Sequence, residues 1–244
     1  MYSLLVIASS AAAMPIVMYA QSNDTATIEK RDIPKKLIYY GGPLITKIEV
    51  QPIFYGSFKD KTKQDLADYY EFLGNSYYSE FISAEYSVPN QTIEFGPVLP
   101  SYTYTGTLKK SLEDSKETKQ LLRNLVSKGI LNPNNNSYYP IYLAPGINAT
   151  QGPQTACVEF CGYHGTIDIS DISDTKYLYY GVLPDQSGWC MGGCGDSEDP
   201  FDNLLSITAH EYAEAITDPA IGVATSLDSP LSWYLLSEGE NGDM

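Results

Sequence analysis

The segment between Asp199 and Pro219 constrains the fold most, because both of its ends carry helix signals. Asp199 followed by Pro200 is typical of an N-cap and the first residue of a helix, and Pro219 predicts the helix end. Apolar residues recur along one side of the segment: Leu204, Leu205, Ile207, Tyr212 and Ile216. We therefore expect one long helix that packs behind a sheet.

This helix carries the stretch His210-Glu211-Tyr212-Ala213-Glu214. His210 and Glu214 lie about 40° apart around the helix axis, so both side chains can reach one ion from successive turns. Glu211 is offset by one residue and can stand beside the ion as the general base for a metal-bound water. The stretch resembles the His-Glu-x-x-His helix of zinc metallopeptidases, with Glu214 replacing the second histidine. We expect zinc, although a carboxylate ligand also suits other divalent metals.

Acidic residues after the helix supply the rest of the predicted site. By analogy with a group of zinc peptidases whose third ligand is a downstream glutamate, Glu240 would be the third ligand, and Asp243 would orient His210. Asp218, one turn beyond Glu214, is the alternative third ligand. Its competing role is to end the helix before Pro219, and both roles stay open.

The second histidine and the cysteines lie together before the helix. His164 is flanked by glycines in Cys161-Gly162-Tyr163-His164-Gly165, so it can approach a substrate or an ion closely. It would stabilise an oxyanion or complete the coordination sphere, unless it is an ordinary loop histidine. The four cysteines Cys157, Cys161, Cys190 and Cys194 allow three disulfide pairings, and we expect either cross-bridging or two small local loops. A zinc cluster is the weaker alternative in an exported chain.

The N-terminal region predicts export. Leu4 to Ala20 is an uncharged, apolar run that is too short for a membrane span, so residues 1–20 are interpreted as a signal peptide, with Ala13 as an alternative cleavage site and an N-terminal anchor as an alternative role. Residues 21–31 would be a propeptide that ends at the dibasic pair Lys30-Arg31. This leaves residues 32–244 as one domain without a membrane span.

Two further features agree with an extracellular protein. Glycosylation sequons begin at Asn23, Asn90, Asn135 and Asn148. The formal net charge of −15 disfavours binding to nucleic acid and to anionic lipid. The partner expected instead is a protein or peptide substrate, or a cell-wall component.

The remaining pattern predicts a single α+β domain, with a mixed sheet packed on long helices and with disulfide-tied loops. A hydrophobic content of 43% suits one globular core. Asp114 and Glu117 have the spacing of a capping box before a helix that ends at Gly129. A tyrosine-rich helix is expected over residues 63–81. The expected strands lie at 37–40, 48–51, 91–104, 138–143 and 176–183.

Several stretches together resemble a known family: Tyr40-Gly41-Gly42-Pro43, Ile53-Phe54-Tyr55-Gly56, Phe160-Cys161-Gly162-Tyr163-His164, Tyr180-Gly181-Val182-Leu183-Pro184, Cys190 to Cys194, and His210 to Pro219. They are similar to the secreted phosphate-induced, exordium-like superfamily, especially its microbial branch with the metal-type helix. The resemblance runs from about Leu37 to the C-terminus. It implies a zincin-like fold, extracellular or cell-wall association and peptidase activity. Relatives would continue past Met244, so we expect a C-terminally truncated chain.

Three functional hypotheses follow, in order of preference. The first is a secreted metal-dependent hydrolase, a zinc metallopeptidase-like protein in which Glu211 activates a water held by His210, Glu214 and Glu240. The second is a non-catalytic extracellular or cell-wall-associated protein with a structural metal. The third treats the helix as an ordinary core element whose carboxylates form a solvated face.

Overall fold

A computed structural model describes residues 4–7, 16–19 and 35–243. Within the predicted signal peptide, β1 (Leu4–Ile7) and β2 (Ile16–Tyr19) form an antiparallel pair. Both cleavage sites at Ala13 and Ala20, the Lys30-Arg31 pair and the Asn23 sequon lie outside the described residues. Of the helices that the structure describes, none is both long and apolar enough to cross a membrane.

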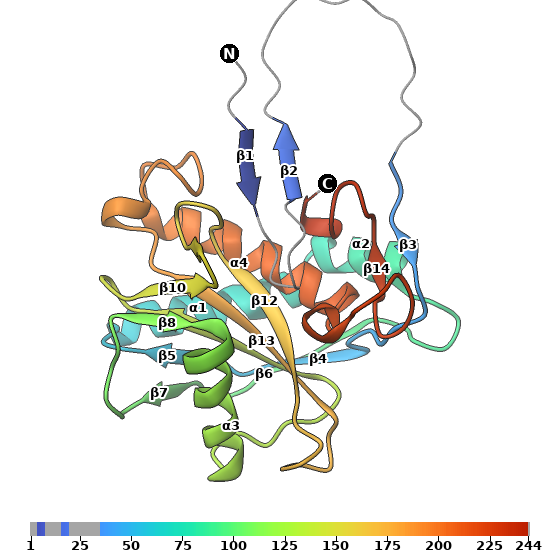
Figure 1. Cartoon of the computed structure of the whole chain (residues 1–244), viewed down its shortest axis with the longest axis horizontal. Helices are drawn as coiled ribbons and strands as arrows, with labels where there is room; N and C mark the ends of the chain where they lie inside the picture. The colour runs from blue at the N-terminus through green and yellow to red at the C-terminus, as the bar shows by residue number, and fades with distance from the viewer. Residues whose placement is uncertain (1–3, 8–15, 20–34, 244) are drawn as a thin grey trace, which may run out of the picture.

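The largest sheet has seven strands and is parallel except at one edge (Figure 1). The strands are β4 (Lys47–Val50), β5 (Ile53–Tyr55), β6 (Glu94–Val98), β7 (Tyr102–Tyr104), β9 (Ser137–Leu143), β12 (Tyr163–Asp168) and β13 (Tyr177–Pro184). The order is β12-β13-β9-β4-β6, and β12 pairs antiparallel with β13. Strands β4 and β5 both pair with β9 on either side of Gln51-Pro52. The proline cannot donate to the ladder, and the strand is interrupted there.

Both faces of this sheet are covered, as parallel sheets require. Strand β9 is buried at every position. Tyr138 and Tyr142 pack into one hydrophobic core with Ile48, Val50 and Phe54. The alternate residues Tyr139, Ile141 and Leu143 pack into a second core on the opposite face. The strands expected at 48–51, 138–143 and 176–183 are confirmed, and the region 91–104 forms β6 and β7.

The first core lies between the sheet and the helices α1 (Asp60–Gly74), α2 (Tyr77–Tyr86) and α4 (Pro200–Thr217). The prediction of one helix over residues 63–81 is wrong, because the helix breaks at Asn75 and Ser76. The Asn75 side-chain amide donates to the Glu71 carbonyl at 2.7 Å, and the Ser76 hydroxyl donates to the Leu73 carbonyl at 2.8 Å. These side chains occupy the last carbonyls of α1 and compete with helix continuation. Tyr77, the first residue of α2 after this break, is 88% exposed.

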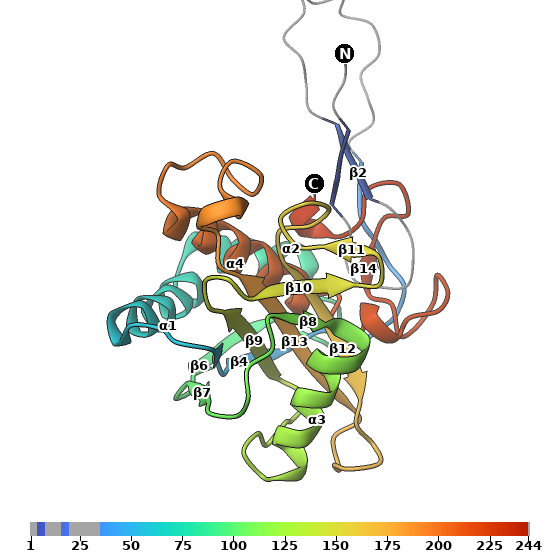
Figure 2. The same cartoon turned by 60° about the vertical axis from the view of Figure 1, so that its left-hand side comes forward.

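The second core lies under α3 (Lys119–Ser127) and a small sheet of β8 (Ser111–Glu113), β10 (Asn148–Gln151) and β11 (Gln154–Thr155) (Figure 2). A π-helical turn, Asp114–Thr118, precedes α3. The cap lies one residue earlier than predicted: Glu113 accepts from the Lys116 N–H, and Glu117 accepts from the Glu113 N–H. Asp114 instead is buried and accepts hydrogen bonds from Tyr163 and Tyr180. Gly129 adopts a left-handed φ of 66° just past the helix, as expected.

The disulfides are Cys157–Cys190 and Cys161–Cys194, so the cross-bridged pairing is confirmed and the two local loops are excluded. They tie the loop before β12 to the loop before α4. Two disulfides suggest an extracellular or otherwise oxidising environment. Asn90 and Asn135 are exposed and Asn148 is half-buried, while glycosylation itself stays a prediction.

The C-terminal segment packs back on the domain. The strand β14 (Trp233–Tyr234) pairs with β3 (Ile38–Tyr39), and 3-10 turns lie at Gly188–Cys190, Ile221–Val223 and Asn241–Asp243. The last of these turns contacts α4. The α+β class, the mixed sheet on long helices and the disulfide-tied loops are thus confirmed.

Candidate metal centre

Helix α4 begins and ends where its sequence signals predict. The Asp199 side chain accepts from the Phe201 N–H at 2.9 Å, and Pro200 is the first helical residue. At the other end, Asp218 is the C-cap, and its N–H donates to the Glu214 carbonyl at 2.8 Å. The last turns of the helix therefore present His210, Glu211 and Glu214 beneath strand β12.

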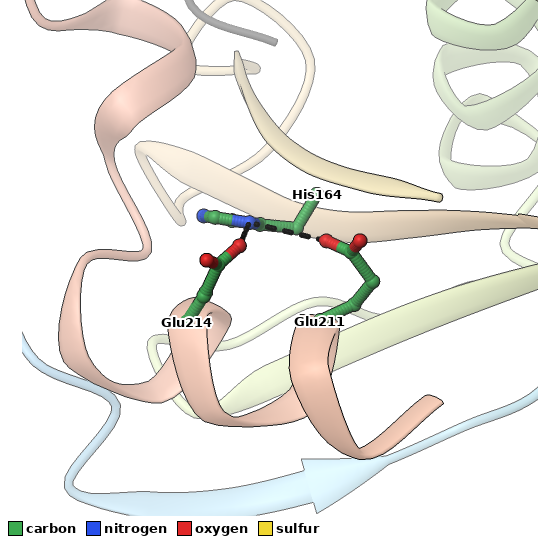
Figure 3. A group of neighbouring side chains, drawn as sticks. All are labelled: His164, Glu211 and Glu214. Carbon is green, nitrogen blue, oxygen red and sulfur yellow. Dashed lines mark ion pairs between the residues drawn. The ribbon is translucent and has the colours of Figure 1, made fainter. Parts of the chain in front are cut away.

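One group of potential ligands is wholly buried, and we call it the inner group: His164, Glu211 and Glu214. His164 Nδ1 lies 3.6 Å from Glu211 Oε2 and 3.4 Å from Glu214 Oε2. Figure 3 shows both carboxylates rising from α4 toward the same imidazole ring. The three residues are only 1%, 3% and 1% exposed. Strand β12 and the helix thus enclose the inner group.

A second group, the outer group, consists of His210, Glu214 and Asp243. His210 Nε2 lies 3.2 Å from Glu214 Oε1 and 3.7 Å from Asp243 Oδ1. The His210 side chain is 28% exposed, so this group is open on one side. Glu214 belongs to both groups and directs a different oxygen into each.

Two further acids adjoin His164 from behind. Glu240 is fully buried, and its Oε1 lies 3.3 Å from His164 Nε2. The same ring nitrogen lies 3.3 Å from the Asp218 backbone carbonyl. Asp218 Oδ1 accepts from the Ser232 N–H at 2.8 Å, which fixes the chain after the helix. Among the described residues, Asp218 Oδ2 and both Glu240 oxygens are buried without a hydrogen-bond partner.

With all its acids ionised, the cluster would carry an excess of buried negative charge. It contains five carboxylates, whereas its two histidines could neutralise only two negative charges if both were protonated. No lysine or arginine in the described part of the chain forms an ion pair with these acids. Buried acids are paired, bind a metal or become neutral through a raised pKa, so this arrangement could hold a cation.

Burial and neighbouring charges shift the pKa values of the groups in this cluster. Burial raises the pKa of Asp218 and of Asp243 to about 7, and it raises the pKa of Glu240 well above its ordinary range. Burial also disfavours the charged form of Glu214, but His210 and His164 lower its pKa to about 2. For His210, burial lowers the pKa, and the charge of Glu214 more than reverses this, to about 10.

The donor set fits a divalent ion. Imidazole nitrogen and carboxylate oxygen are accepted zinc ligands, and other divalent metals bind the same atoms. Ligands at about 2.1 Å in a tetrahedron are separated by about 3.4 Å, which is close to the nitrogen–oxygen distances in both groups. The buried histidine and glutamate groups could therefore hold a metal ion.

The structure brings all seven predicted site residues into this one cluster, and the ligand and catalytic roles predicted for them stay predictions. Asp243, expected to orient His210, is a potential ligand in the outer group, because its Oδ1 lies close enough to His210 Nε2 for both atoms to bind one ion. Glu240, expected as the third ligand beside His210, contacts His164 instead. Asp218 performs its structural role as the helix cap, and it is a member of neither group. The ligand roles of Glu240 and Asp218 stay predictions.

Sequence reasoning missed residues that make room for the cluster or adjoin it. A Cβ atom on Gly242 would lie 2.8 Å from His210 Nδ1 and 2.9 Å from Glu214 Oε1. A Cβ on Gly162 would lie 2.6 Å from Ile207 Cγ2 and 3.1 Å from Glu211 Oε1. Burial, together with nearby charges led by Glu240, raises the pKa of Tyr234 to about 12. The available signal was a glycine two residues before His164, in Cys161-Gly162-Tyr163-His164, and a glycine next to Asp243, in Asn241-Gly242-Asp243.

A groove of about 1200 Å³ reaches the outer group from the surface. It lies between α4 and the α1–α2 junction, and its lining includes Tyr69, Phe72, Tyr77, Leu205, Ala209 and His210. Phe72 is 64% exposed there. His210 therefore connects the buried cluster with an open, partly aromatic surface.

Fold and site together define an α+β protein with cross-linked loops and a buried histidine–carboxylate centre suited to a metal. Comparisons of the chain with protein-family models, with curated proteins and with solved structures found no match.

Proposed function

We propose that the protein is a secreted metal-dependent hydrolase that cleaves peptide bonds, with zinc as its preferred ion. The observation that carries this proposal is the position of His210. It belongs to the metallopeptidase-type stretch of α4, it lies at ligand distance from Glu214 and Asp243, and it lines the groove. An ion at this outer group would face a surface where a polypeptide can bind.

The chain supplies the groups that such a reaction needs. His210, Glu214 and Asp243 would hold the ion, which when bound would polarise a carbonyl and lower the pKa of a water. Glu211 would accept a proton from the attacking water and deliver it to the leaving amine as the C–N bond breaks. His164, at 3.6 Å from Glu211 Oε2, would keep that carboxylate in position.

The family resemblance agrees with this proposal. The resemblance implies a zincin-like fold, and the α+β arrangement, with α4 in contact with the antiparallel edge strand β12, is compatible with it. Exordium-like proteins are extracellular or cell-wall associated, which agrees with two disulfides and an apolar N-terminal run.

One observation favours the alternative, a non-catalytic extracellular or cell-wall-associated protein with a structural ion. The inner group is closed on all sides, as structural metal sites are. In that case the protein binds metal and has no hydrolytic activity.

Metal analysis combined with a Glu211→Gln variant separates these functions. For a hydrolase, wild-type protein contains metal and cleaves unfolded protein substrates, whereas the variant loses at least about 100-fold in kcat because it lacks the proton acceptor. The variant should still contain metal at the outer group. Asp114→Asn is the matched control, because Asp114 is a buried acid outside the cluster, and this variant should remain active. Metal without any cleavage would support the structural alternative.

A further inference from the structure

We propose that the centre binds two divalent cations, one in the outer group and a second in the inner group, with the carboxylate of Glu214 bridging them. The second site, made by His164, Glu211 and Glu214, is distinct from the ion site on which the proposed function depends. The two ion sites share only Glu214, and the proposed proton acceptor Glu211 is also a ligand of the second site.

The geometry of Glu214 is the first observation that supports two cations. Its Oε2 lies 3.4 Å from His164 Nδ1, and its Oε1 lies 3.2 Å from His210 Nε2. A carboxylate that directs each oxygen to a different imidazole has the geometry of a bridging ligand. Two-metal sites with ions about 3.5–4 Å apart are built around such bridges.

A buried carboxylate oxygen in the inner group is the second observation that supports an inner cation. Glu211 Oε2 is buried in the inner group and has no hydrogen-bond partner among the described residues. An ionised oxygen in this situation has lost its water and has gained only the long contact of 3.6 Å with His164 Nδ1, which favours a bound cation. Asp114 shows what the chain does with an ordinary buried acid, because two tyrosine hydroxyls donate to it and Lys119 pairs with it.

The surroundings of His164 are the third observation that supports an inner cation. While Nδ1 faces the inner group, Nε2 faces Glu240 Oε1 and the Asp218 carbonyl, each at 3.3 Å. A metal-ligating histidine commonly presents its other ring nitrogen to a carboxylate or a backbone carbonyl, which orients the ring and strengthens it as a ligand. Glu240 and Asp218 therefore act as positioning residues for an inner cation.

The charge of the cluster agrees with two cations. If all five carboxylates are ionised, one divalent ion and neutral histidines would leave three negative charges in a buried volume, whereas two divalent ions would leave one. Glu211 can serve both proposed roles because its two oxygens differ: one would bind the inner cation and the other would accept the proton. Glu211 Oε2 faces His164, whereas Oε1 lies toward Gly162.

The test is the metal stoichiometry of the full chain, with each histidine variant serving as the control for the other. After zinc loading and gel filtration, elemental analysis should find two zinc ions per wild-type chain, and one each in His164→Ala and in His210→Ala. Chelator should remove zinc from the wild type in a fast and a slow phase, because the outer group is open and the inner group is closed. His164→Ala should lose the slow phase and His210→Ala the fast one.

A second measurement protects the test against misfolding of His164→Ala. Glu211→Gln is nearly isosteric and should also bind one zinc, with only the fast phase. In the manganese-loaded wild type, electron paramagnetic resonance should show two coupled ions, and in Glu211→Gln a single uncoupled ion. One zinc per wild-type chain, retained in both His164→Ala and Glu211→Gln, would overturn the second site and leave the proposed hydrolase standing. Two zinc ions without any peptide cleavage would support the second site and overturn the proposed hydrolase.

Discussion

At the scale of single residues, the centre depends on contacts too close for a larger side chain. Gly242 sits against His210 and Glu214, in the turn that also brings Asp243 to the outer group. The backbone of this turn packs directly on α4. A side chain here must displace a ligand or move the turn.

Replacing Gly242 by alanine should therefore weaken the outer group selectively. The new Cβ, 2.8 Å from His210 Nδ1, would displace the imidazole by a fraction of an ångström or more. We expect kcat to fall by up to about 100-fold, because misplacement by about 1 Å can have that effect. The fast-exchanging zinc should bind more weakly, with the slow one unchanged, as measured by chelator competition.

Gly193→Ala is the control for this substitution. Its Cβ would lie 3.5 Å from the nearest atom, the Cys157 carbonyl oxygen, which is ordinary contact. This variant should keep wild-type kinetics and zinc affinity. Equal losses in both variants would show that Gly242 has no specific role beside His210.

At the scale of elements, the disulfides attach the two loops next to the centre to one another. Cys157–Cys190 and Cys161–Cys194 each join residues 33 apart, and their ends lie only a few residues from each other. If either bridge is removed, the remaining bridge still closes the long loop, so the removed bridge had closed only a small additional loop of about ten residues. If both are removed, the long loop opens as well. The two bridges are therefore energetically coupled.

Removing both disulfides should destabilise the protein by more than the sum of the single removals. In the loop-entropy description, each Cys→Ser pair alone costs about 2.5 kcal/mol and both together about 6 kcal/mol. Denaturant unfolding of the three variants measures this difference. Strictly additive costs would show that the two bridges constrain the unfolded chain independently.

The elements also show where local signals were sufficient. Helix α4 and strands β9 and β13 follow their predicted bounds closely, because caps, prolines and apolar spacing act within a few residues. The break between α1 and α2 was missed, since the apolar spacing continues through Asn75 and Ser76 while their side chains end the helix. The sequence pattern predicts no strand at β12, because Gly165 and the polar residues of this segment form a strand only through their pairing with β13.

At the scale of the whole molecule, a buried acidic centre makes stability depend on pH, and we expect it to depend on bound cations as well. Asp218 and Asp243 have folded pKa values of about 7, above the ordinary value of 3.8. Without an ion, their contribution favours folding at low pH and is lost as pH rises toward 7. His210, raised from 6.5 to about 10, loses its contribution as pH rises from 6.5 to about 10. Glu214, with a folded pKa of about 2, has the opposite sign, but only between pH 4.5 and 2.

Chelator-treated protein should therefore melt at a lower temperature at pH 8 than at pH 5. Zinc-loaded protein should show the opposite trend, because ligation requires deprotonated carboxylates and neutral imidazole. Thermal melts with and without zinc between pH 5 and 9 measure this, and the stabilisation by zinc should grow with pH. Melting curves that respond to pH identically with and without zinc would contradict a metal at the cluster.

The sequence by itself determined the α+β class, the extent of α4 and the candidate residues of the centre, because periodicity, caps and ligand spacing are local properties. Only the tertiary structure decided the disulfide pairing and which acid meets which histidine. Glu240 and Asp243 are three residues apart, yet the turn at Asn241–Asp243 sends one to His164 and the other to His210. Which histidine each acid contacts depends on how the C-terminal segment packs across β12 and α4. Contacts between segments so far apart in the chain produce no recognisable spacing of residues in the sequence.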